Sequence, residues 1–532
     1  MGKLDEYHTV MVQQLEEGVL ELVPEVHTGK VIHYIPHQAV IREEAESTKM
    51  RIVYDCSTKQ NPQAPSLNDC LEVGPPLQPA IFDILLRNRM KPFCITGDIK
   101  KAFLQIKISP EDRDALRLLW YDNLKERNIV QYRFTRVIFG SGQSPYILGA
   151  TLEKHIGQYE EKYPNTVNEL LQNTFVDDVQ SGGDGKEELL KFKEEATQIM
   201  NEGGFQLHKW HSNIPEIEKL SVSEVEGPQE NSTYAKLTVG TQPHESKILG
   251  VPWNKEEDTF SINFAKTLKG VEEGPLTKRK MLSAINSIFD LLGTAAPVVI
   301  VGKVLYSEVC LRKLRWDEEV PVDIQRPWTK WLNDLKECPY VTIPRSVVGV
   351  GLTGVILHGF SDASKLAVSV AVYAVTTHIA TPVQQRLLVA KSRIAPKDQS
   401  IPRLELVAAH TLSRLMHHVK EVSKDVRVEE YHCWVDSTTV LYWIKGQGTW
   451  SQFVRNRTKA IQDKEYLQWH HVPTAENPSD QGSRGMPPSK MGELWFRGPK
   501  WLSTQEEWPD QPEVSENCKE RIKPKHEKQF LV

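Results

Sequence analysis

Two adjacent acidic residues, Asp177 and Asp178, lie in an apolar run that favours a β-strand, and the turn formers Ser181, Gly182 and Gly183 follow. This pattern predicts a tight hairpin with the two acids at its tip. Neighbouring carboxylates in apolar surroundings repel one another and lose hydration, so a cation must compensate. Oxygen ligands favour magnesium or manganese over zinc. The pair therefore indicates phosphate chemistry in which two metal ions stabilise the attacking and leaving oxygens.

A third acid, Asp98, lies in an earlier strand-like segment, residues 94–99. Because side chains alternate along a strand, Thr96 and Asp98 share one face of it. An isolated Asp-Asp pair is most often a plain surface turn. The prediction of a metal site therefore depends on Asp98 lying next to the hairpin.

Four further acids follow separate predicted elements in the C-terminal half. Asp362 lies where the strand 356–360 ends, Glu405 on a helix that begins near Pro402, Asp436 after the strand 431–435, and Asp480 in the first turn of a helix capped by Ser479. Taken singly, each acid is more commonly an exposed charge. Together, they can converge on one sheet edge and hold two metal ions.

The elements that must position these acids include helices and strands in alternation. The apolar residues within 104–108 alternate with polar ones and predict a half-buried strand, and Ser144 with Pro145 predicts a helix that runs to about Tyr159. The charged stretch 216–242 has poor periodicity and predicts an insertion or loop. We therefore expect an α+β or α/β multidomain protein.

The second half of the chain restarts the pattern. Residues 275–340 are mainly of helical type, and strands at 367–375 and 387–391 then precede the helix near Pro402. The last ~40 residues are rich in Pro, Lys and Glu, which predicts a partly disordered tail.

Composition narrows the class of protein. The chain has 532 residues, enough for about three or four folded units. Its net charge of -5 argues against a plain electrostatic nucleic-acid binder, although an acidic metal site lowers the net charge of an enzyme that still has local basic clusters. No apolar stretch is long enough to span a bilayer and no secretory signal is evident, so we expect a cytoplasmic protein that is not secreted.

Three motifs in this order resemble those of reverse transcriptases: residues 98–103 their first catalytic strand, 139–145 their template- and nucleotide-contacting loop, and 175–178 their aromatic-x-Asp-Asp box. Leu249-Gly250 resembles the turn that grips the primer. Phe139 stands where retroviral enzymes commonly have glutamine, so a nucleotide contact through that side chain is not carried over.

The same resemblance implies nucleotide-binding roles for four residues. Arg51 corresponds to an arginine on the incoming triphosphate, and Phe103 to an aromatic gate that excludes the ribonucleotide 2′-hydroxyl. Gly140 belongs to the nucleotide-contacting loop, and Lys209 matches a lysine near the leaving phosphate. Alone, Arg51 and Lys209 would be read as solvated surface charges.

The acids of the C-terminal half occur in the order of the Asp, Glu, Asp, Asp set of the ribonuclease H fold, which cuts the RNA strand of an RNA–DNA hybrid. Arg455 and Arg457 are candidates for holding phosphates of the hybrid. Retroviral relatives often have a histidine in the loop before the last acid. Here, His470 and His471 lie earlier, in the preceding strand, which argues against a histidine role in product release.

Further motifs resemble the Pao/BEL class of long-terminal-repeat retrotransposons. They are residues 203–205, 209–213, 276–280, 288–293, 296–297 and 401–406. The resemblance implies four parts: fingers and palm at 1–265, a helical thumb or connection at 266–345, a ribonuclease H-like domain at 346–490, and a tail at 491–532 that leads toward an integrase.

By this resemblance the chain copies RNA into DNA and cuts the RNA of the hybrid, with two Mg²⁺ ions in each active site and Mn²⁺ as an alternative. All seven acids, Asp98, Asp177, Asp178, Asp362, Glu405, Asp436 and Asp480, would be both catalytic residues and metal ligands. The implied partners are an RNA template, a DNA primer, RNA–DNA hybrid and deoxynucleoside triphosphates, without a membrane. A second copy of the chain, other products of the same polyprotein and enclosure in virus-like particles are further options.

Two alternatives stay open at this point. One is a catalytically inactive or host-adopted nucleic-acid-binding relic, and the other is a nuclease whose polymerase part is only a scaffold. The complete set of expected acids argues against decay.

Overall fold

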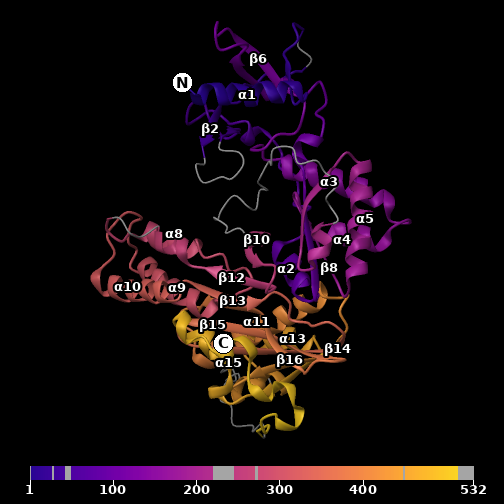
Figure 1. Cartoon of the computed structure of the whole chain (residues 1–532). Coiled ribbons are helices and arrows are strands. Elements are labelled where there is room, and N and C mark those ends of the chain that lie inside the picture. The colour runs from indigo at the N-terminus through magenta and orange to yellow at the C-terminus, as the bar shows by residue number, and fades with distance from the viewer. Residues whose placement is uncertain are drawn as a thin grey trace, which may run out of the picture. The chain divides into compact units, whose positions relative to one another are not determined.

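The computed structural model describes residues 2–26, 29–41, 50–219, 245–269, 274–446 and 450–512. The chain forms two compact units (Figure 1). Unit 1 comprises residues 1–84, 94–181 and 186–242, and unit 2 comprises 85–93, 182–185 and 243–532. The insertion predicted at 216–242 lies mostly outside the described residues, as does the end of the predicted tail.

Unit 1 is built around a four-stranded sheet in the order β7-β8-β4-β9. Its strands are β7 (Thr174–Phe175), β8 (Asp178–Gly183), β4 (Phe93–Ile99) and β9 (Leu207–Ser212), and its helices are α2 (Ile81–Arg89), α3 (Ser144–Ile156), α4 (Pro164–Asn173), α5 (Lys186–Glu202) and α6 (Pro215–Lys219). The last residues of α2, the first of β4 and the last of β8 belong to unit 2. The helix predicted from Ser144 is confirmed as α3 with a short 3₁₀ turn after it.

The N-terminal part of unit 1 contains two small sheets. Its elements are α1 (Gly2–Glu16), β1 (Leu20–Leu22), β2 (His37–Ile41), β3 (Met50–Tyr54), β5 (Arg117–Tyr121) and β6 (Ile129–Phe134). Strands β1, β6 and β5 form one antiparallel sheet, and β2 pairs with β3 in the other. A shared apolar core that includes Tyr54, Leu118 and Phe134 lies among them.

The strand predicted at 104–108 is wrong. Residues Ala102–Gln105 form a 3₁₀ helix instead, and one isolated bridge from Lys107 to Arg136 follows it. Lys101 has a φ of 49°, so the chain turns out of the β-region directly after β4. The alternating apolar residues still serve the core, because Leu104 and Ile108 pack against the N-terminal cluster.

Unit 2 begins with an antiparallel sheet and a helical layer. The strands β10 (Glu245–Ile248), β11 (Val251–Asn254), β12 (Thr259–Asn263) and β13 (Tyr340–Pro344) pair in that order. The helices are α7 (Ala265–Lys269), α8 (Lys278–Asn286), α9 (Ala296–Leu311) and α10 (Val322–Glu337), which matches the helical type predicted for 275–340. The predicted division into four parts stays a prediction. In the structure, β10, β11 and β12 belong to the same unit as β13, and not to unit 1.

The remainder of unit 2 is a mixed five-stranded sheet, in the orange part of Figure 1. Its order is β16 (Gln384–Ile394), β15 (Ala367–His378), β14 (Leu352–Ala363), β17 (Val428–Val435) and β18 (Leu467–His471). Strands β14 to β16 are antiparallel, whereas β14, β17 and β18 run parallel to one another. The helices around it are α11 (Ile401–Val422), α12 (Thr438–Lys445), α13 (Gln452–Gln462), α14 (Pro478–Arg484) and α15 (Glu493–Arg497).

Alternation along β14 assigns the two faces of this sheet. At Gly359, an added Cβ would lie 2.5 Å from Leu412 Cδ1, so this residue faces α11 and allows the helix to approach closely. The next residue, Phe360, belongs to the opposite apolar layer with Trp434, Trp495 and Trp501. The apolar stripe predicted for α11 is buried.

Much of the predicted tail is folded. After α15, short 3₁₀ helices at Lys500–Ser503 and Gln505–Glu507 follow, and Trp495, Trp501 and Leu502 are buried. The Tyr373 hydroxyl donates to the Trp495 carbonyl at 2.8 Å. The average composition of the tail conceals these large apolar side chains, which supply the buried surface that ordering requires.

A search of the described residues finds no helix with both the length and the apolar character that crossing a membrane requires.

Three histidines on neighbouring strands form what we call the histidine face: His358 on β14, His432 on β17 and His470 on β18. His432 Nδ1 lies 3.1 Å from His470 Nε2, and Trp434 Nε1 donates to His358 Nδ1 at 3.2 Å. The Trp508 ring lies over all three, with centroid distances of 4.7 to 5.6 Å. Neutral imidazoles satisfy these contacts, since His358 Nδ1 must be unprotonated to accept the hydrogen bond from Trp434 Nε1.

The histidine face should make stability depend on pH. Burial, with His432 and Lys445 adding to it, lowers the pKa of His470 to about 4. Between about pH 4 and 6.5, His470 therefore binds a proton more readily in the unfolded chain than in the folded one. The stabilisation of the folded state by neutral His470 is full above about pH 6.5 and is lost as the pH falls through that window. From pH 7.5 to 5, wild type should lose about 1 to 3 kcal/mol more unfolding free energy than His470→Gln. Denaturant unfolding of both proteins at both pH values measures this, and equal losses would contradict it.

Candidate active sites

The first site lies in unit 1, where three acids meet on adjacent strands. Asp98 is on β4, and Asp177 and Asp178 are at the β7–β8 hairpin, whose second strand neighbours β4. The Ile99 amide donates to the Asp177 carbonyl at 2.8 Å, which ties the hairpin tip to β4. The three residues are only 3%, 8% and 5% exposed. The structure thus brings together the acids that the sequence predicted to meet.

The hairpin turn itself lies earlier than predicted. Phe175 pairs with Asp178, so Val176 and Asp177 form the turn, and the expected turn formers Ser181 and Gly182 continue β8. Val176 has a φ of 57°, a left-handed conformation that is strained for a β-branched residue. Strain of this kind costs about 1 to 3 kcal/mol and is typical of functional sites.

The sequence analysis did not predict that two polar residues near the acids contact each other. Gln180 Nε2 donates to Thr96 Oγ1 at 2.9 Å, and both side chains are buried. Each residue lies two positions from an acid of its own strand, Asp178 or Asp98, and therefore on the same face. This two-residue spacing along each strand was the sequence signal that could have revealed the pair. The bond links β8 to β4 beneath the acids.

The predicted nucleotide-binding residues lie on several elements of unit 1. Phe103 lies in the 3₁₀ helix after β4 and is buried, with its ring centroid 4.7 Å from that of Phe139. Gly140 has a φ of 93°, and an added Cβ would lie 2.6 Å from the Tyr54 carbonyl oxygen, so only glycine fits there. Lys209 is on β9 beside β4, with a φ of 52°. Arg51 is on β3, in the two-stranded sheet with β2.

The second site lies in unit 2, at one end of the five-stranded sheet. Asp362 is near the end of β14, Asp436 directly follows β17, Glu405 is on α11 and Asp480 is on α14. Parallel pairing of Ser361 with Val435 brings the ends of β14 and β17 level. Arg484 Nε donates to the Asp480 carboxylate at 2.6 Å. The Ser483 hydroxyl donates to the Asp362 carboxylate.

The cap of α14 differs from the prediction. Asn477, not Ser479, is the N-cap, and its Oδ1 accepts from the Ser479 amide at 3.1 Å. Its Nδ2 also donates to the Ser361 carbonyl at 3.0 Å. One side chain therefore begins the helix that carries Asp480 and binds it to the strand that carries Asp362.

The carboxylates of the second site interact electrostatically. Burial raises the pKa of Asp362 to about 6, and the charges of Asp436 and Asp480 add to this although Ser483 opposes it. Burial likewise raises the pKa of Glu405, with Asp436 and Asp362 contributing in the same direction. The pKa of Asp436 is raised by burial and by Asp480. The carboxyl groups of Asp362, Glu405 and Asp436 therefore each lie close enough to another acid for its charge to raise their pKa.

A metal cage is not preformed at either site. Within the ranges that the structure describes, no three His, Cys, Asp or Glu side chains stand in an arrangement that could hold a metal ion. The predicted pairs of metal ions therefore stay a prediction. The residues nevertheless fit a cation at the second site, since a positive charge would relieve the unfavourable ionisation of Asp362, Glu405 and Asp436.

The other residues singled out near the second site stay predictions or find structural roles. Arg457 lies over the Phe453 ring on α13, with its Cζ 3.7 Å from the ring centroid, and no contact tests a role for Arg455 or Arg457 with phosphates. His470 belongs to the histidine face and has a lowered pKa.

Comparison with known proteins gives one family match for each half of the chain. Residues 41–252 match the family model "Reverse transcriptase (RNA-dependent DNA polymerase)", and residues 277–437 match "Pao retrotransposon-like RNaseH-like domain". No curated protein matches the chain.

Two solved structures share the fold. One is a foamy viral protease-reverse transcriptase dRH in complex with double-stranded DNA, with a TM-score of 0.52 and 13% identity over 87% of this chain and 68% of that chain. The other is a foamy viral protease-reverse transcriptase in complex with RNA/DNA hybrid, with a TM-score of 0.50 and 14% identity over 88% of this chain and 53% of that chain. The chain thus spans about half of the second protein.

Proposed function

We propose that this chain is an RNA-directed DNA polymerase with ribonuclease H function, and that its two carboxylate sites divide that work. Its matches to a reverse transcriptase model and to a Pao retrotransposon-like RNaseH-like model support this. The site of Asp98, Asp177 and Asp178 joins nucleotides. The site of Asp362, Glu405, Asp436 and Asp480 cuts RNA. The observation that carries this proposal is the convergence of both acid sets from distant positions in the sequence.

At the polymerase site, the buried carboxylates of Asp98, Asp177 and Asp178 would hold two Mg²⁺ ions, with Mn²⁺ as an alternative. When bound, such ions lower the pKa of the attacking hydroxyl and neutralise charge on the leaving phosphate. The strained Val176 turn fixes the backbone between Phe175 and Asp178, which limits the freedom of the carboxylates.

Four residues would complete the nucleotide site. Arg51 would bind the triphosphate and Lys209 would stabilise the leaving phosphate, because both side chains are positively charged donors. Gly140 would let the loop backbone approach the nucleotide, and Phe103 would exclude a 2′-hydroxyl by its bulk. The contact of Phe103 with Phe139 supports this last role, since a packed ring cannot turn aside for an extra oxygen.

At the second site, the four acids would hold the metal ions that activate water against the RNA strand. Asp362 and Asp436 extend from neighbouring parallel strands, and Glu405 and Asp480 from helices packed beside them. RNA template, DNA primer, hybrid and deoxynucleoside triphosphates are the proposed substrates. Contacts to them would be mainly to the backbone, so we expect binding without base specificity that weakens steeply with salt.

Primer extension tests the proposal directly. The purified chain, an RNA template, a DNA primer and deoxynucleoside triphosphates should give extended DNA in Mg²⁺, and none after chelation with EDTA. A labelled RNA–DNA hybrid in the same buffers measures cleavage. Binding without either activity would favour the relic, and cleavage without extension would favour the nuclease with a scaffold.

A further inference from the structure

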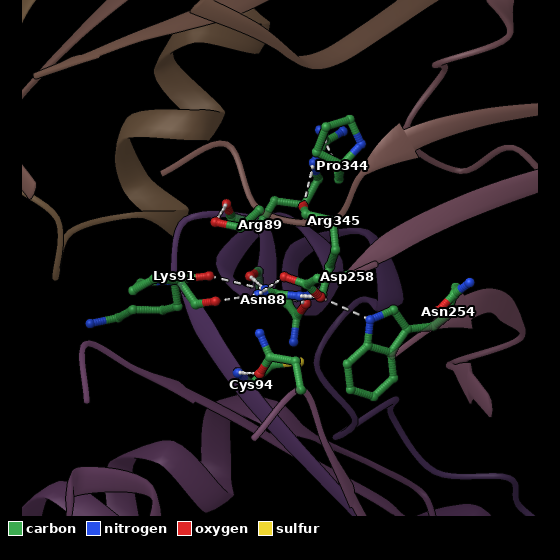
Figure 2. A network of polar contacts seen from close by, with 12 residues as sticks. Asn88, Arg89, Lys91, Cys94, Asn254, Asp258, Pro344 and Arg345 are labelled. Carbon is green, nitrogen blue, oxygen red and sulfur yellow. Dashed lines mark hydrogen bonds and ion pairs between the residues drawn. The ribbon is translucent and has the colours of Figure 1, made fainter. Parts of the chain in front are cut away.

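Two buried arginines, Arg345 and Arg89, anchor a short segment of unit 2 that leads into the polymerase strand β4 (Figure 2). The segment is residues 85–93, which include the end of α2. Arg345 is 0% exposed and Arg89 is 1% exposed. A guanidinium buried to this degree is costly unless its donors are satisfied, so the hydrogen bonds around it must be extensive.

Arg345 binds this segment through three of its backbone carbonyls. Its Nη1 donates to the carbonyls of Asn88 at 2.6 Å and Lys91 at 3.0 Å, and its Nη2 donates to that of Pro92 at 2.7 Å. On its other side, Nε and Nη2 form a bidentate pair with Asp258, at 2.6 and 2.7 Å. Asp258 compensates the charge while the remaining donors define the path of the chain.

Arg89 closes the network from the opposite side. Its Nε donates to the Arg345 carbonyl at 3.1 Å, and its other nitrogens donate to the carbonyls of Pro344, Leu387 and Leu388 at 2.8 to 3.2 Å. Burial, with the charges of Arg345 and Arg386 adding to it, lowers the pKa of Arg89 to about 9, so the side chain stays charged at neutral pH. The segment is thereby held to β13 and β16.

The ends of both catalytic strands of the polymerase site lie at this anchor. Pro92 directly precedes β4, which carries Asp98. The last residues of β8, which carries Asp178, pack on the same segment: a Cβ added to Gly182 would lie 2.7 Å from Lys91 Cβ and 3.2 Å from the Phe93 carbonyl oxygen. Lys91 Nζ also pairs with Asp184 Oδ2 at 3.8 Å.

We propose that Arg345 is a positioning residue for primer extension, which fixes the ends of β4 and β8 and thereby the spacing of the acids that these strands carry. The proposal rests on the proposed function of the first site. Asp98 lies six positions after Pro92, about 20 Å along a strand, so Arg345 touches no reacting atom. A hydrogen-bonded pair of strands transmits a shift at its end, and an error of about 1 Å between reacting groups can cost about 100-fold in rate.

A lysine at this position would test the role. Its single ammonium keeps the charge opposite Asp258 but cannot at the same time donate to the three carbonyls that Arg345 binds. We expect Arg345→Lys to lower kcat for extension about 10- to 100-fold, with KM for the nucleotide and hybrid cleavage each within about threefold of wild type. The matched control is Arg312→Lys, since Arg312 makes an exposed bidentate pair with Asp323 in the same unit. It should leave both activities unchanged.

Hydrogen exchange gives a readout that a purely structural role would not produce. In Arg345→Lys, the amides of 94–99 should exchange faster, while those of β17 keep wild-type protection. Should Arg345→Lys fail to fold, Asp258→Asn removes only the charge partner, and it should produce the same pattern with a smaller loss.

Specific outcomes overturn the proposal. An Arg345→Lys protein with unchanged extension, or with equal losses of extension and cleavage, would show that the arginine only stabilises unit 2. If wild type extends no primer, the proposed function fails, and the positioning role is then judged by exchange alone. Unchanged protection of 94–99 would refute it.

Discussion

The Asp177→Asn variant should extend a DNA primer about 1000-fold more slowly than wild type, or worse, while cutting an RNA–DNA hybrid at the wild-type rate. The substitution keeps the size of the side chain and removes the charge with which a cation would pair. Its structural cost should be small, because the Asp177 contact that ties the hairpin to β4 is made by the backbone carbonyl. Loss of extension would therefore report chemistry and not misfolding.

Single-turnover extension with a preformed primer–template complex measures this effect apart from substrate binding. Asp112→Asn is the matched control, because Asp112 is an exposed aspartate of the same unit, and it should extend at the wild-type rate. An Asp177→Asn protein that extends within tenfold of wild type would remove Asp177 from the catalytic set. Loss of cleavage as well would indicate global damage.

The acids of both sites could be predicted because each lies at a recognisable place in a strongly patterned element. Asp98 lies in an alternating strand, and Asp177 and Asp178 interrupt an apolar run where a charged pair is unexpected. Such local anomalies point to function because burying charge is costly without compensation. The meeting of these acids then followed from pairing between neighbouring strands.

The local geometry of the sites could not be predicted in the same way. The turn lies at Val176, a residue that disfavours left-handed backbone, while the glycines that favour turns continue a strand. Similarly, the strand expected at 104–108 is absent because Lys101 takes a left-handed conformation after β4. In each case tertiary packing prevailed over local propensity.

Long-range contacts were the other limit. Arg345 and the Asn88 carbonyl are 257 positions apart in the chain, and a single arginine carries no local signal of such a partner. The described part of the tail shows the same limit, since Trp495 and Trp501 bind a surface that exists only once the sheet has formed. Sequence patterns describe the faces of elements well, but they do not reveal which distant face will cover them.

Replacing Asp436 in the second site should lower hybrid cleavage and raise the free energy of unfolding. Asp436→Asn should reduce hybrid cleavage about 1000-fold or more and leave extension intact, because the variant lacks one of the charges needed to hold a cation against phosphate. In metal-free buffer at pH 7.5 it should also unfold with a free energy about 1 kcal/mol higher than wild type. The reason is that Asp436 raises the pKa of Asp362 and of Glu405, so removing its charge relieves repulsion among buried acids.

The pH dependence of this gain in unfolding free energy shows whether it comes from reduced charge repulsion or from better packing. With a folded pKa of about 6 against 3.8 unfolded, Asp362 binds a proton more readily in the folded state, so wild type gains stability from this group as the pH falls through that window. Repulsion from Asp436 is felt only while Asp362 is ionised. The advantage of Asp436→Asn should therefore be largest at pH 7.5 and shrink at pH 5. Denaturant unfolding in EDTA at both pH values measures it, and an advantage that stays constant with pH would refute the electrostatic origin.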